Sequence, residues 1–399
     1  MDKKKVFVTT SFRNCQMNNY LTAQISQFAG LNDCEVVDSA EASDYIVVTT
    51  CGFDQPREDH SRDMITQLAN EHPGKKVVVS GCLPGIAPDF NKGLDNVIPI
   101  NTDQLHGFDK LFEAKVAIKT VKPNVIEDIP RHGPKGLFNI EISKGCTNRC
   151  TFCVIWKTKG RLHSKSINDI VAEIEDGLKR GYDRFCFLSD NVSLYGIDLR
   201  IDLADLLNRV GEIEGDFKVM LYYAHPRQFA PLYPKITKAA MDRICYLDLP
   251  FQSGSQALLK EMKRDYIPSD VVALAKQIKR EHPDVVLASH FIIGFPGETM
   301  EDFFETLSCA QYFDQVTFFP YSDRAGTVAA KMTNHVSQQE LDQRTEIVSQ
   351  FVKGNPRMQL MEPNVGAGEH LDESKPIAGQ FVAGKLMMQV VQPAQSAGH

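Results

Sequence analysis

The sequence predicts an α/β protein of two units followed by a short extension. In residues 1–125, β-branched runs alternate with helix-like stretches, as expected of an open parallel sheet. In residues 137–332, strand, loop and helix follow one another repeatedly, which predicts a partial barrel of six βα units. Residues 333–399 begin with a helix and end in a short extension. We expect these three ranges to be the domains of the chain.

The N-terminal range carries cysteines where its predicted strands end. Those strands are rich in β-branched residues and cover 6–10, 45–50 and 76–80. Cys15 follows the first by five residues, Cys51 follows the second directly, and Cys82 follows the third after one glycine. The carboxyl ends of parallel strands meet at one crevice, so the three thiols would converge there. The alternative, which these residues alone leave open, is that they are unrelated small residues in tight turns.

The second range repeats the strand–loop–helix pattern several times. Strands are expected at 138–142, 185–189, 219–223, 246–250, 289–293 and 316–319. Helices are expected at 255–264, 269–281 and 301–312, after an earlier one that Ser166 caps. A capping box at Ser337 and Glu340 starts the helix of the extension. In βα barrels the active site lies where the strands end and the loops begin.

One such loop holds Cys146, Cys150 and Cys153 in the spacing C-x3-C-x2-C. A four-iron cluster that only carries electrons takes four thiolates. Three thiolates leave one iron open for a substrate or a cofactor. A zinc site would need a fourth ligand nearby, but Cys186 lies in a predicted strand and His163 alone is a poor partner. The spacing therefore favours an iron–sulfur cluster with one open iron.

Short motifs along most of the chain support this interpretation and narrow it. They are the cysteine loop at 145–155, the basic run 159–165, and the segments 189–196, 249–255, 293–298 and 321–327. In this order they resemble the methylthiotransferases of the radical S-adenosylmethionine (SAM) superfamily. The residues around Cys15, Cys51 and Cys82 resemble the N-terminal motifs of the same family. The resemblance implies that the second range is a radical SAM barrel.

The resemblance also implies two [4Fe-4S] clusters and SAM as cofactors. Cys146, Cys150 and Cys153 (the radical cysteines) would hold the cluster whose open iron binds SAM. Cys15, Cys51 and Cys82 (the auxiliary cysteines) would hold the cluster that supplies sulfur. An electron donor such as flavodoxin or ferredoxin would reduce the first cluster. SAM cleavage would then yield a radical that activates a C–H bond, and a methylthio group would be inserted there.

Eight residues match positions where the family contacts SAM. They are Phe152, Ser189, Asp190, Asn191, Gln252, Ser253, Gly294 and Glu298. Shielding of the cluster is the alternative role for Phe152, and a carboxylate at a helix N-terminus is the alternative for Glu298. Arg324 either steers substrate or the auxiliary cluster, or forms an ion pair within its loop.

The chain departs from the family pattern in two places. Tyr20 and Leu21 replace an acidic residue and a serine. After the radical cysteines, Ile155-Trp156 and Lys159-Gly160 stand where Ile-Pro and Arg-Gly are usual. Neither change removes an iron ligand, so the departures affect substrate contacts and packing and leave the expected chemistry intact.

Composition bounds the compartment and the partners. The chain has 399 residues, ten cysteines and no run of 18 apolar residues, and Met1–Lys5 leads directly into a strand. We expect a cytoplasmic, monomeric enzyme without membrane contact, whose cysteines are ligands or buried thiols.

The substrate is the open question at this stage. The formal net charge of −7, and a tail too short for the family's substrate-docking TRAM β-barrel, favour a peptide or a small molecule and predict weak tRNA binding. A tRNA adenosine derivative is the alternative, favoured by the motifs Gln252–Ser255 and Tyr321–Thr327. A non-catalytic iron–sulfur electron carrier or sensor is a third interpretation, from another class of protein.

Overall fold

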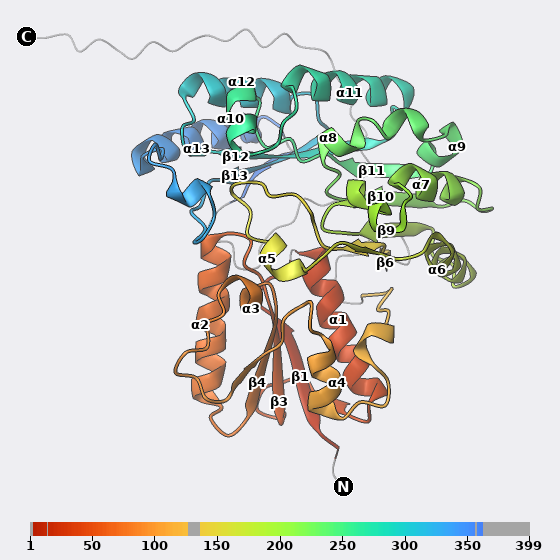
Figure 1. Cartoon of the computed structure of the whole chain (residues 1–399), viewed down its shortest axis with the longest axis vertical. Helices are drawn as coiled ribbons and strands as arrows, with labels where there is room; N and C mark the ends of the chain where they lie inside the picture. Colours follow the sequence, from red (N-terminus) through yellow and green to blue (C-terminus); the bar gives the residue numbers. More distant parts are fainter. Residues whose placement is uncertain (1–2, 14, 127–135, 356, 362–399) are drawn as a thin grey trace, which may run out of the picture.

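The computed structural model describes residues 3–13, 15–126, 136–355 and 357–361 (Figure 1). Two parallel sheets with helices on their faces confirm the predicted α/β fold. A five-stranded sheet with its helices forms the N-terminal unit, in the lower half of Figure 1. A seven-stranded sheet with its helices forms the barrel unit above it. The division at residues 125 and 137 stays a prediction.

The N-terminal unit has the sheet order β2-β1-β3-β4-β5, and all its pairs are parallel. Its strands are β1 (Lys5–Thr10), β2 (Glu35–Val36), β3 (Tyr45–Thr50), β4 (Lys76–Gly81) and β5 (Val97–Pro99). Its helices are α1 (Gln16–Leu31), α2 (Gln55–Glu71), α3 (Leu83–Ile86) and α4 (His106–Phe112). The three predicted strands are the three central strands of this sheet.

Alternation along these strands explains why both faces of the sheet are covered. Val47 and Val78 pack with Phe28 of α1 and Phe108 of α4. Their neighbours on the same strands point the other way and pack with Ile65 of α2. Runs that are β-branched at every position are therefore apolar on both faces, which a buried parallel sheet requires.

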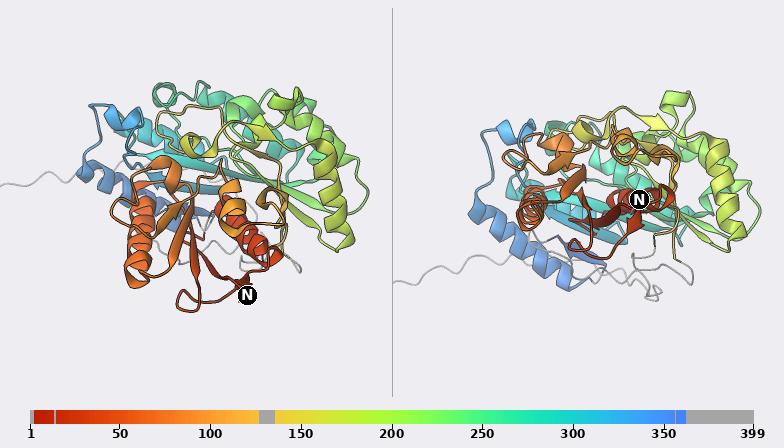
Figure 2. Two further views of the ribbon diagram at one scale, coloured as in Figure 1. Left: turned by 60° about the horizontal axis from the view of Figure 1, so that its bottom comes forward. Right: turned by 90° about the horizontal axis from the view of Figure 1, so that it is seen from below.

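The barrel unit has the sheet order β14-β13-β12-β11-β10-β9-β6, again all parallel. Its strands are β6 (Phe138–Glu141), β9 (Arg184–Leu188), β10 (Lys218–Leu221), β11 (Ile244–Asp248), β12 (Val286–Ile293), β13 (Gln315–Pro320) and β14 (Met358–Leu360). Its helices are α6 (Ile167–Lys179), α7 (Leu203–Gly211), α8 (Pro226–Phe229), α9 (Lys238–Met241), α10 (Gln256–Glu261), α11 (Pro268–Glu281), α12 (Met300–Ala310) and α13 (Gln338–Lys353). Figure 2 shows α13 (blue) at one end of this unit and α6 (yellow-green) at the other.

Shorter elements complete the chain. The hairpin of β7 (Ser143–Lys144) and β8 (His163–Ser164) encloses the short helix α5 (Trp156–Lys159). Turns of 3-10 helix cover Ile118–Thr120, Val192–Leu194, Ile197–Leu199, Tyr233–Lys235 and Ala329–Lys331. No helix of the described residues is both long and apolar enough to cross a membrane.

The sheet of the barrel unit has one strand more than the six that the sequence predicts. As expected, Ser337 caps α13 in a capping box with Glu340. After this helix the chain returns as β14 and pairs with β13, so part of the extension continues the barrel sheet. Three residues carry too little pattern to predict a strand. The strands expected near 377–391 lie outside the described residues.

A buried ion pair joins the two units. Arg324, 3% exposed, follows β13, and its Nη2 lies 2.5 Å from Oε2 of Glu58 on α2. The same guanidinium donates to the carbonyl of Gly52 and to the side chain of Gln55, each at 2.9 Å. Gln55 N–H also donates to Ser322 Oγ at 3.0 Å. Of the two roles expected for Arg324, the structure shows an ion pair, made between the units rather than within its own loop.

We expect Arg324→Met to lower the free energy of unfolding by about 3–5 kcal/mol, because it leaves the buried Glu58 carboxylate without this partner. Adding Glu58→Gln should recover part of the loss, since the unpaired charge is then gone. Urea denaturation of the four proteins of this double-mutant cycle measures the coupling. Independent, additive effects would contradict the role of the pair.

Candidate active site

The auxiliary cysteines converge at the carboxyl edge of the N-terminal sheet. Cys15 immediately precedes α1, Cys51 follows β3 and Cys82 precedes α3. Burial raises the pKa of the Cys51 thiol, and the neighbouring Cys15 and Cys82 raise it further. Burial also raises the pKa of Cys82, with Cys15 again contributing. Each thiol thus lies within electrostatic reach of the others, as the position of the strands predicted.

The turn that places Cys82 requires a glycine before it. Gly81 has φ of +94°, and a Cβ there would lie 2.4 Å from the carbonyl oxygen of Thr50. Thr50 holds the turn from the other side: its carbonyl accepts the Cys82 N–H at 2.9 Å, and its hydroxyl accepts the Leu83 N–H at 3.2 Å. Strand β3 therefore fixes the cysteine that follows β4.

The radical cysteines lie on the loop between β7 and α5. Burial raises the pKa of Cys146 to about 11 and that of Cys153 to about 12, and Cys150 adds to both shifts. Arg264 donates from Nη1 to the Cys150 sulfur at 3.8 Å. The loop is anchored to the end of α10 by Thr151, whose N–H and hydroxyl donate to the carbonyls of Met262 and Glu261.

The two cysteine loops are packed against each other through α3 and α5. Thr158 of α5 fits over Gly85 of α3 so closely that a Cβ on that glycine would lie 2.7 Å from the Thr158 Cβ. The Thr158 hydroxyl donates to the carbonyl of Gly81 at 3.3 Å, and its own carbonyl accepts a hydrogen bond from Thr102. This contact sets the loop of the radical cysteines beside Cys82.

The donor sets fit two iron–sulfur clusters. Each site offers three thiols and backbone N–H groups directed at sulfur: those of Phe53 and Gly52 lower the pKa values of Cys51 and Cys82, which burial raises. Hydrogen bonds to sulfur are one way in which proteins tune such clusters. Within the described ranges, no three His, Cys, Asp or Glu side chains are placed to hold a single metal ion.

Of the expected SAM contacts, the residues after β9 lie at the radical loop. Ser189 Oγ is 2.8 Å from Ser143 Oγ, and Asp190 Oδ2 accepts the N–H of Gly145 at 2.8 Å. The Asn191 side chain donates to Gln228 Oε1 at 2.7 Å. Ser189 and Asp190 thus contact the start of the radical loop directly, and Asn191 reaches it through Gln228, which donates to Asn148 Oδ1 at 2.8 Å. Their contact with SAM stays a prediction.

Three further residues are expected to contact SAM. Gln252 and Phe152 lie at the barrel sheet, and Ser253 lies where the chain packs on α12. Gln252 has φ of +76° and bridges to Phe291 of β12, while Phe152 is half-buried against the barrel core. Ser253 is fully buried and meets Thr306 of α12, with the two hydroxyls 3.3 Å apart. Both sets stay predicted SAM contacts.

Glu298 lies between the chain after β12 and α13. Its Oε2 accepts the Gly294 N–H at 2.7 Å and lies 2.9 Å from Nε of the buried Arg344. Burial raises the pKa of Glu298 to about 7, although both partners oppose the shift. Gly294 has φ of +76°, and a Cβ there would meet the side chain of Leu341 on α13. Gly294 and Arg344 both contact Oε2 of Glu298, whereas Oε1 has no hydrogen-bond partner among the described residues.

Sequence reasoning missed two groups that lie at the cysteines, Arg264 and Tyr223, and a buried carboxylate that contacts Tyr223. Arg264, 6% exposed, contacts Cys150 across a separation of 114 residues. Tyr223 has φ of +60° after β10, and besides burial both Cys15 and Cys51 raise its pKa. Its N–H donates to Asp248, a fully buried carboxylate. None of them belongs to a motif, but a strained non-glycine residue after a barrel strand is a structural sign of a functional site.

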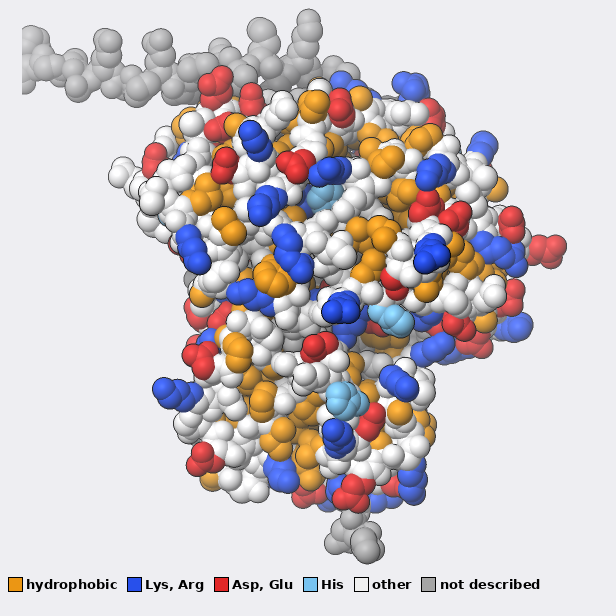
Figure 3. Space-filling model, viewed as in Figure 1, with side chains coloured by type: hydrophobic (Ala, Val, Ile, Leu, Met, Phe, Trp, Pro, Cys, Tyr) orange, Lys and Arg blue, Asp and Glu red, His pale blue; other side chains and the backbone are white. Residues whose placement is uncertain are grey.

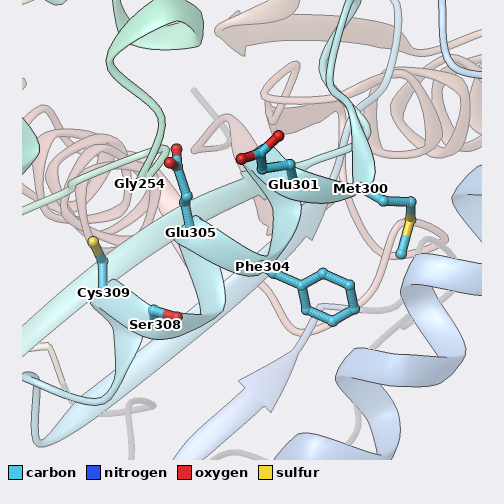
Figure 4. A pocket seen from close by; sticks show the side chains of 7 residues that line it. All are labelled: Gly254, Met300, Glu301, Phe304, Glu305, Ser308 and Cys309. Atoms are coloured by element: carbon cyan, nitrogen blue, oxygen red, sulfur yellow. The ribbon is translucent and has the colours of Figure 1, made fainter. Parts of the chain in front are cut away.

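An open pocket of about 680 Å³ lies elsewhere (Figure 4). Its lining is mostly one face of α12: Gly254, Met300, Glu301, Phe304, Glu305, Ser308 and Cys309. None of the predicted site residues lines it. The cysteine loops, rather than this pocket, define the site.

An α/β chain with three cysteines at the carboxyl edge of one parallel sheet, and three more on a single loop of the barrel unit, has the architecture of a two-cluster iron–sulfur enzyme. Comparisons with known proteins agree. Residues 140–310 match the radical SAM superfamily, and residues 5–96 match the uncharacterized protein family UPF0004. The chain is 32% identical to the ribosomal protein uS12 methylthiotransferase RimO of Carboxydothermus hydrogenoformans, over 77% of this chain and 73% of that protein.

A tRNA-2-methylthio-N(6)-dimethylallyladenosine synthase of Clostridium perfringens is similarly close. It is 33% identical, over 84% of this chain and 79% of that protein. Among solved structures, the radical SAM methyltransferase TsrM of Kitasatospora setae shares the fold, with a TM-score of 0.56, 15% identity, and coverage of 79% of this chain and 73% of that one. The chain belongs to the radical SAM methylthiotransferase family. It is a sulfur-transferring enzyme that uses SAM and two [4Fe-4S] clusters.

We expect anaerobic reconstitution to load about eight irons per chain, four for each cluster. Changing Cys146, Cys150 and Cys153 together to Ala should leave about half of that iron, bound by the auxiliary cysteines. Iron and sulfide analysis with Mössbauer spectroscopy measures both. A triple variant that kept all its iron would refute the assignment of the radical cysteines.

Proposed function

We propose that this enzyme inserts a methylthio group into an adenosine derivative of tRNA. The observation that carries the proposal is a set of cations around the two cysteine loops, called the cationic rim: Arg13, Arg149, Lys157 and Arg161. Arg13 lies two residues before Cys15, and Arg149 is adjacent to Cys150. Lys157 belongs to α5, and Arg161 follows that helix. Phosphates are the ligands that such cations bind best.

The cationic rim has charge available for a ligand. Arg13, Arg149 and Arg161 are exposed, and no member of the rim has an ion pair within the part of the chain that the structure describes. Among the described residues, the Nζ of Lys157 makes one hydrogen bond, a long one of 3.5 Å to the carbonyl of Ala325. Figure 3 shows Lys and Arg side chains along the junction of the two units on the face drawn there. Surface cations elsewhere are often paired, as in Lys238–Asp242 and Arg180–Asp176.

Aromatic groups accompany these cations. The Arg149 guanidinium lies 4.2 Å from the centre of the Trp156 ring; Arg149 is on the loop of the radical cysteines, and Trp156 begins α5. Arg57 lies over Phe12 and near Phe53 beside the auxiliary cysteines. Cations interleaved with aromatic rings suit a nucleic acid whose target base is unstacked. The presence of tRNA-modifying enzymes among the relatives supports the same choice.

Within this function the two cysteine loops have separate roles. The radical cysteines hold the cluster at which SAM is bound and cleaved, and the auxiliary cysteines hold the sulfur-donating cluster. The contact of α3 with α5 keeps the two sites at a fixed separation. We further propose flavodoxin or ferredoxin as electron donor, a monomer, and a cytoplasmic location, where tRNA is found.

A peptide or small-molecule substrate is the second candidate, supported by the net charge of −7 that the whole chain carries. Cells with and without the gene separate the candidates. If tRNA is the substrate, mass spectrometry of tRNA nucleosides should show a methylthio-adenosine that disappears with the gene. It should return with the wild-type gene and stay absent with Cys51→Ala. Unchanged tRNA nucleosides, with a methylthio group lost from a protein or metabolite, would overturn the tRNA proposal.

We also predict salt-sensitive tRNA binding by the purified enzyme. Changing Arg149, Lys157 and Arg161 to Gln should weaken binding and reduce the slope of log K against log salt by up to about three, about one for each lost phosphate contact. Fluorescence anisotropy across a salt series measures the slope. The matched control changes three exposed lysines elsewhere in the chain, Lys92, Lys119 and Lys353, to Gln. Equal loss in both triple variants would mean that the rim has no special role.

A further inference from the structure

Lys159 is a buried cation at the contact between the two cysteine loops. It is the last residue of α5, six positions after Cys153, and only 10% of its side chain is exposed. Its neighbour Thr158 is the residue that packs on Gly85 and Gly81. Placing an ammonium group in such a position is costly unless negative charge surrounds it.

The surroundings of Lys159 supply that charge from both loops. Its Nζ lies 3.7 Å from Oδ1 of Asp190, the carboxylate that also accepts the Gly145 N–H beside Cys146. Although burial lowers the pKa of Lys159, Asp190, Cys82 and Cys15 together raise it above its ordinary value. In return, Lys159 is the group that most strongly opposes the burial-driven rise in the pKa of Cys82.

The other cations near the site, Lys144 and Arg57, have different partners from Lys159. Lys144, two residues before Cys146, uses its ammonium to donate to the carbonyl of Thr102. Arg57, which lies near Cys51 and Cys15, is paired with Asp54. Glu141 adds negative charge near Lys159. Lys159 therefore lies within electrostatic reach of Cys82 and Cys15, and it contacts Asp190, which accepts the Gly145 N–H at the start of the radical loop.

We propose that Lys159 is a positioning residue whose ammonium group neutralises the thiolates of Cys15 and Cys82 and raises the reduction potential of the auxiliary cluster. The inference rests on the proposed auxiliary site. Three neighbouring thiolates, of which that of Cys51 is buried, concentrate negative charge, and each electron added to the cluster increases it. A fixed cation beside them stabilises the reduced form more than the oxidised form, because its attraction grows with the charge of the cluster. Asp190 holds the ammonium in place and thereby links it to the radical loop.

The test uses the full chain with Cys146, Cys150 and Cys153 changed to Ala, so that only the auxiliary cluster titrates. Into this background we would introduce Lys159→Met, which removes the charge, or Lys159→Arg, which keeps it. Lys92→Met, which removes an exposed lysine of the N-terminal unit that carries the auxiliary cysteines, is the control. Each protein is reconstituted anaerobically, its iron is counted, and its potential is measured by dithionite titration with redox mediators, followed by electron paramagnetic resonance.

We expect Lys159→Met to shift the midpoint potential to more negative values, while Lys159→Arg and Lys92→Met stay near the parent. An unchanged potential in Lys159→Met, or an equal shift in Lys159→Arg, would overturn the inference. If Lys159→Met loads no iron while Lys159→Arg does, the positive charge is needed to hold the cluster, which supports the neutralising role of Lys159. If the parent triple variant itself binds no iron, the auxiliary site is wrong, which is a failure of the proposed function rather than of Lys159 alone.

Discussion

The packing of Thr158 on Gly85 is the contact on which the site depends. It brings α5, which follows the radical cysteines, against α3, which begins after Cys82. A glycine is required because a Cβ would lie within 3 Å of three Thr158 atoms. Sulfur insertion needs the carbon that has lost its hydrogen to meet sulfur before it reacts elsewhere. Two cysteine loops fixed to each other by such a close contact can keep the sulfur close to the carbon radical. Two independently moving units could not do so.

The topology explains why this contact is available at all. Both sheets are parallel, so each gathers its loops at the carboxyl ends of its strands. The units meet with these edges facing each other, and polar groups complete the junction. Arg324 reaches from the chain after β13 to Glu58 and Gly52 beside Cys51. A buried ion pair is weak evidence for stability, but the three acceptors of the Arg324 guanidinium, on Gly52, Gln55 and Glu58, restrict how the two units pack. Its value here is to fix the geometry between the clusters.

The sequence predicted those parts of the structure that depend on residues close together in the chain. Strands β1, β3 and β4, the caps at Ser166 and Ser337, and both sets of cysteines follow from short stretches of sequence. The short helix α3, with the sequence LPGI, has a proline and a glycine, and forms because Thr50 and α5 hold it. Arg264 reaches Cys150 from 114 residues away, so no spacing rule could find it. The motifs predicted that Ser253 and Glu298 lie near the site, but they did not predict which way these side chains point. Ser253 points to Thr306 of α12 and Glu298 to Arg344 of α13, so the packing of these helices decides their orientation.

The net charge of the whole chain does not indicate the charge around the cysteine loops. A net charge of −7 is the sum over 44 basic and 51 acidic residues spread over the whole chain. A bound phosphate responds mainly to charges within a screening length, about 8–10 Å at physiological salt. Around the cysteine loops the nearby groups include Arg13, Arg149, Lys157 and Arg161, while the acidic groups there, such as Asp190, already have partners. Local charge also differs from net charge inside the site. Lys159 interacts electrostatically with Cys82 and Cys15, and Arg264 donates a hydrogen bond to Cys150. An acidic protein can therefore place cations where buried thiolates and an incoming anion both need them.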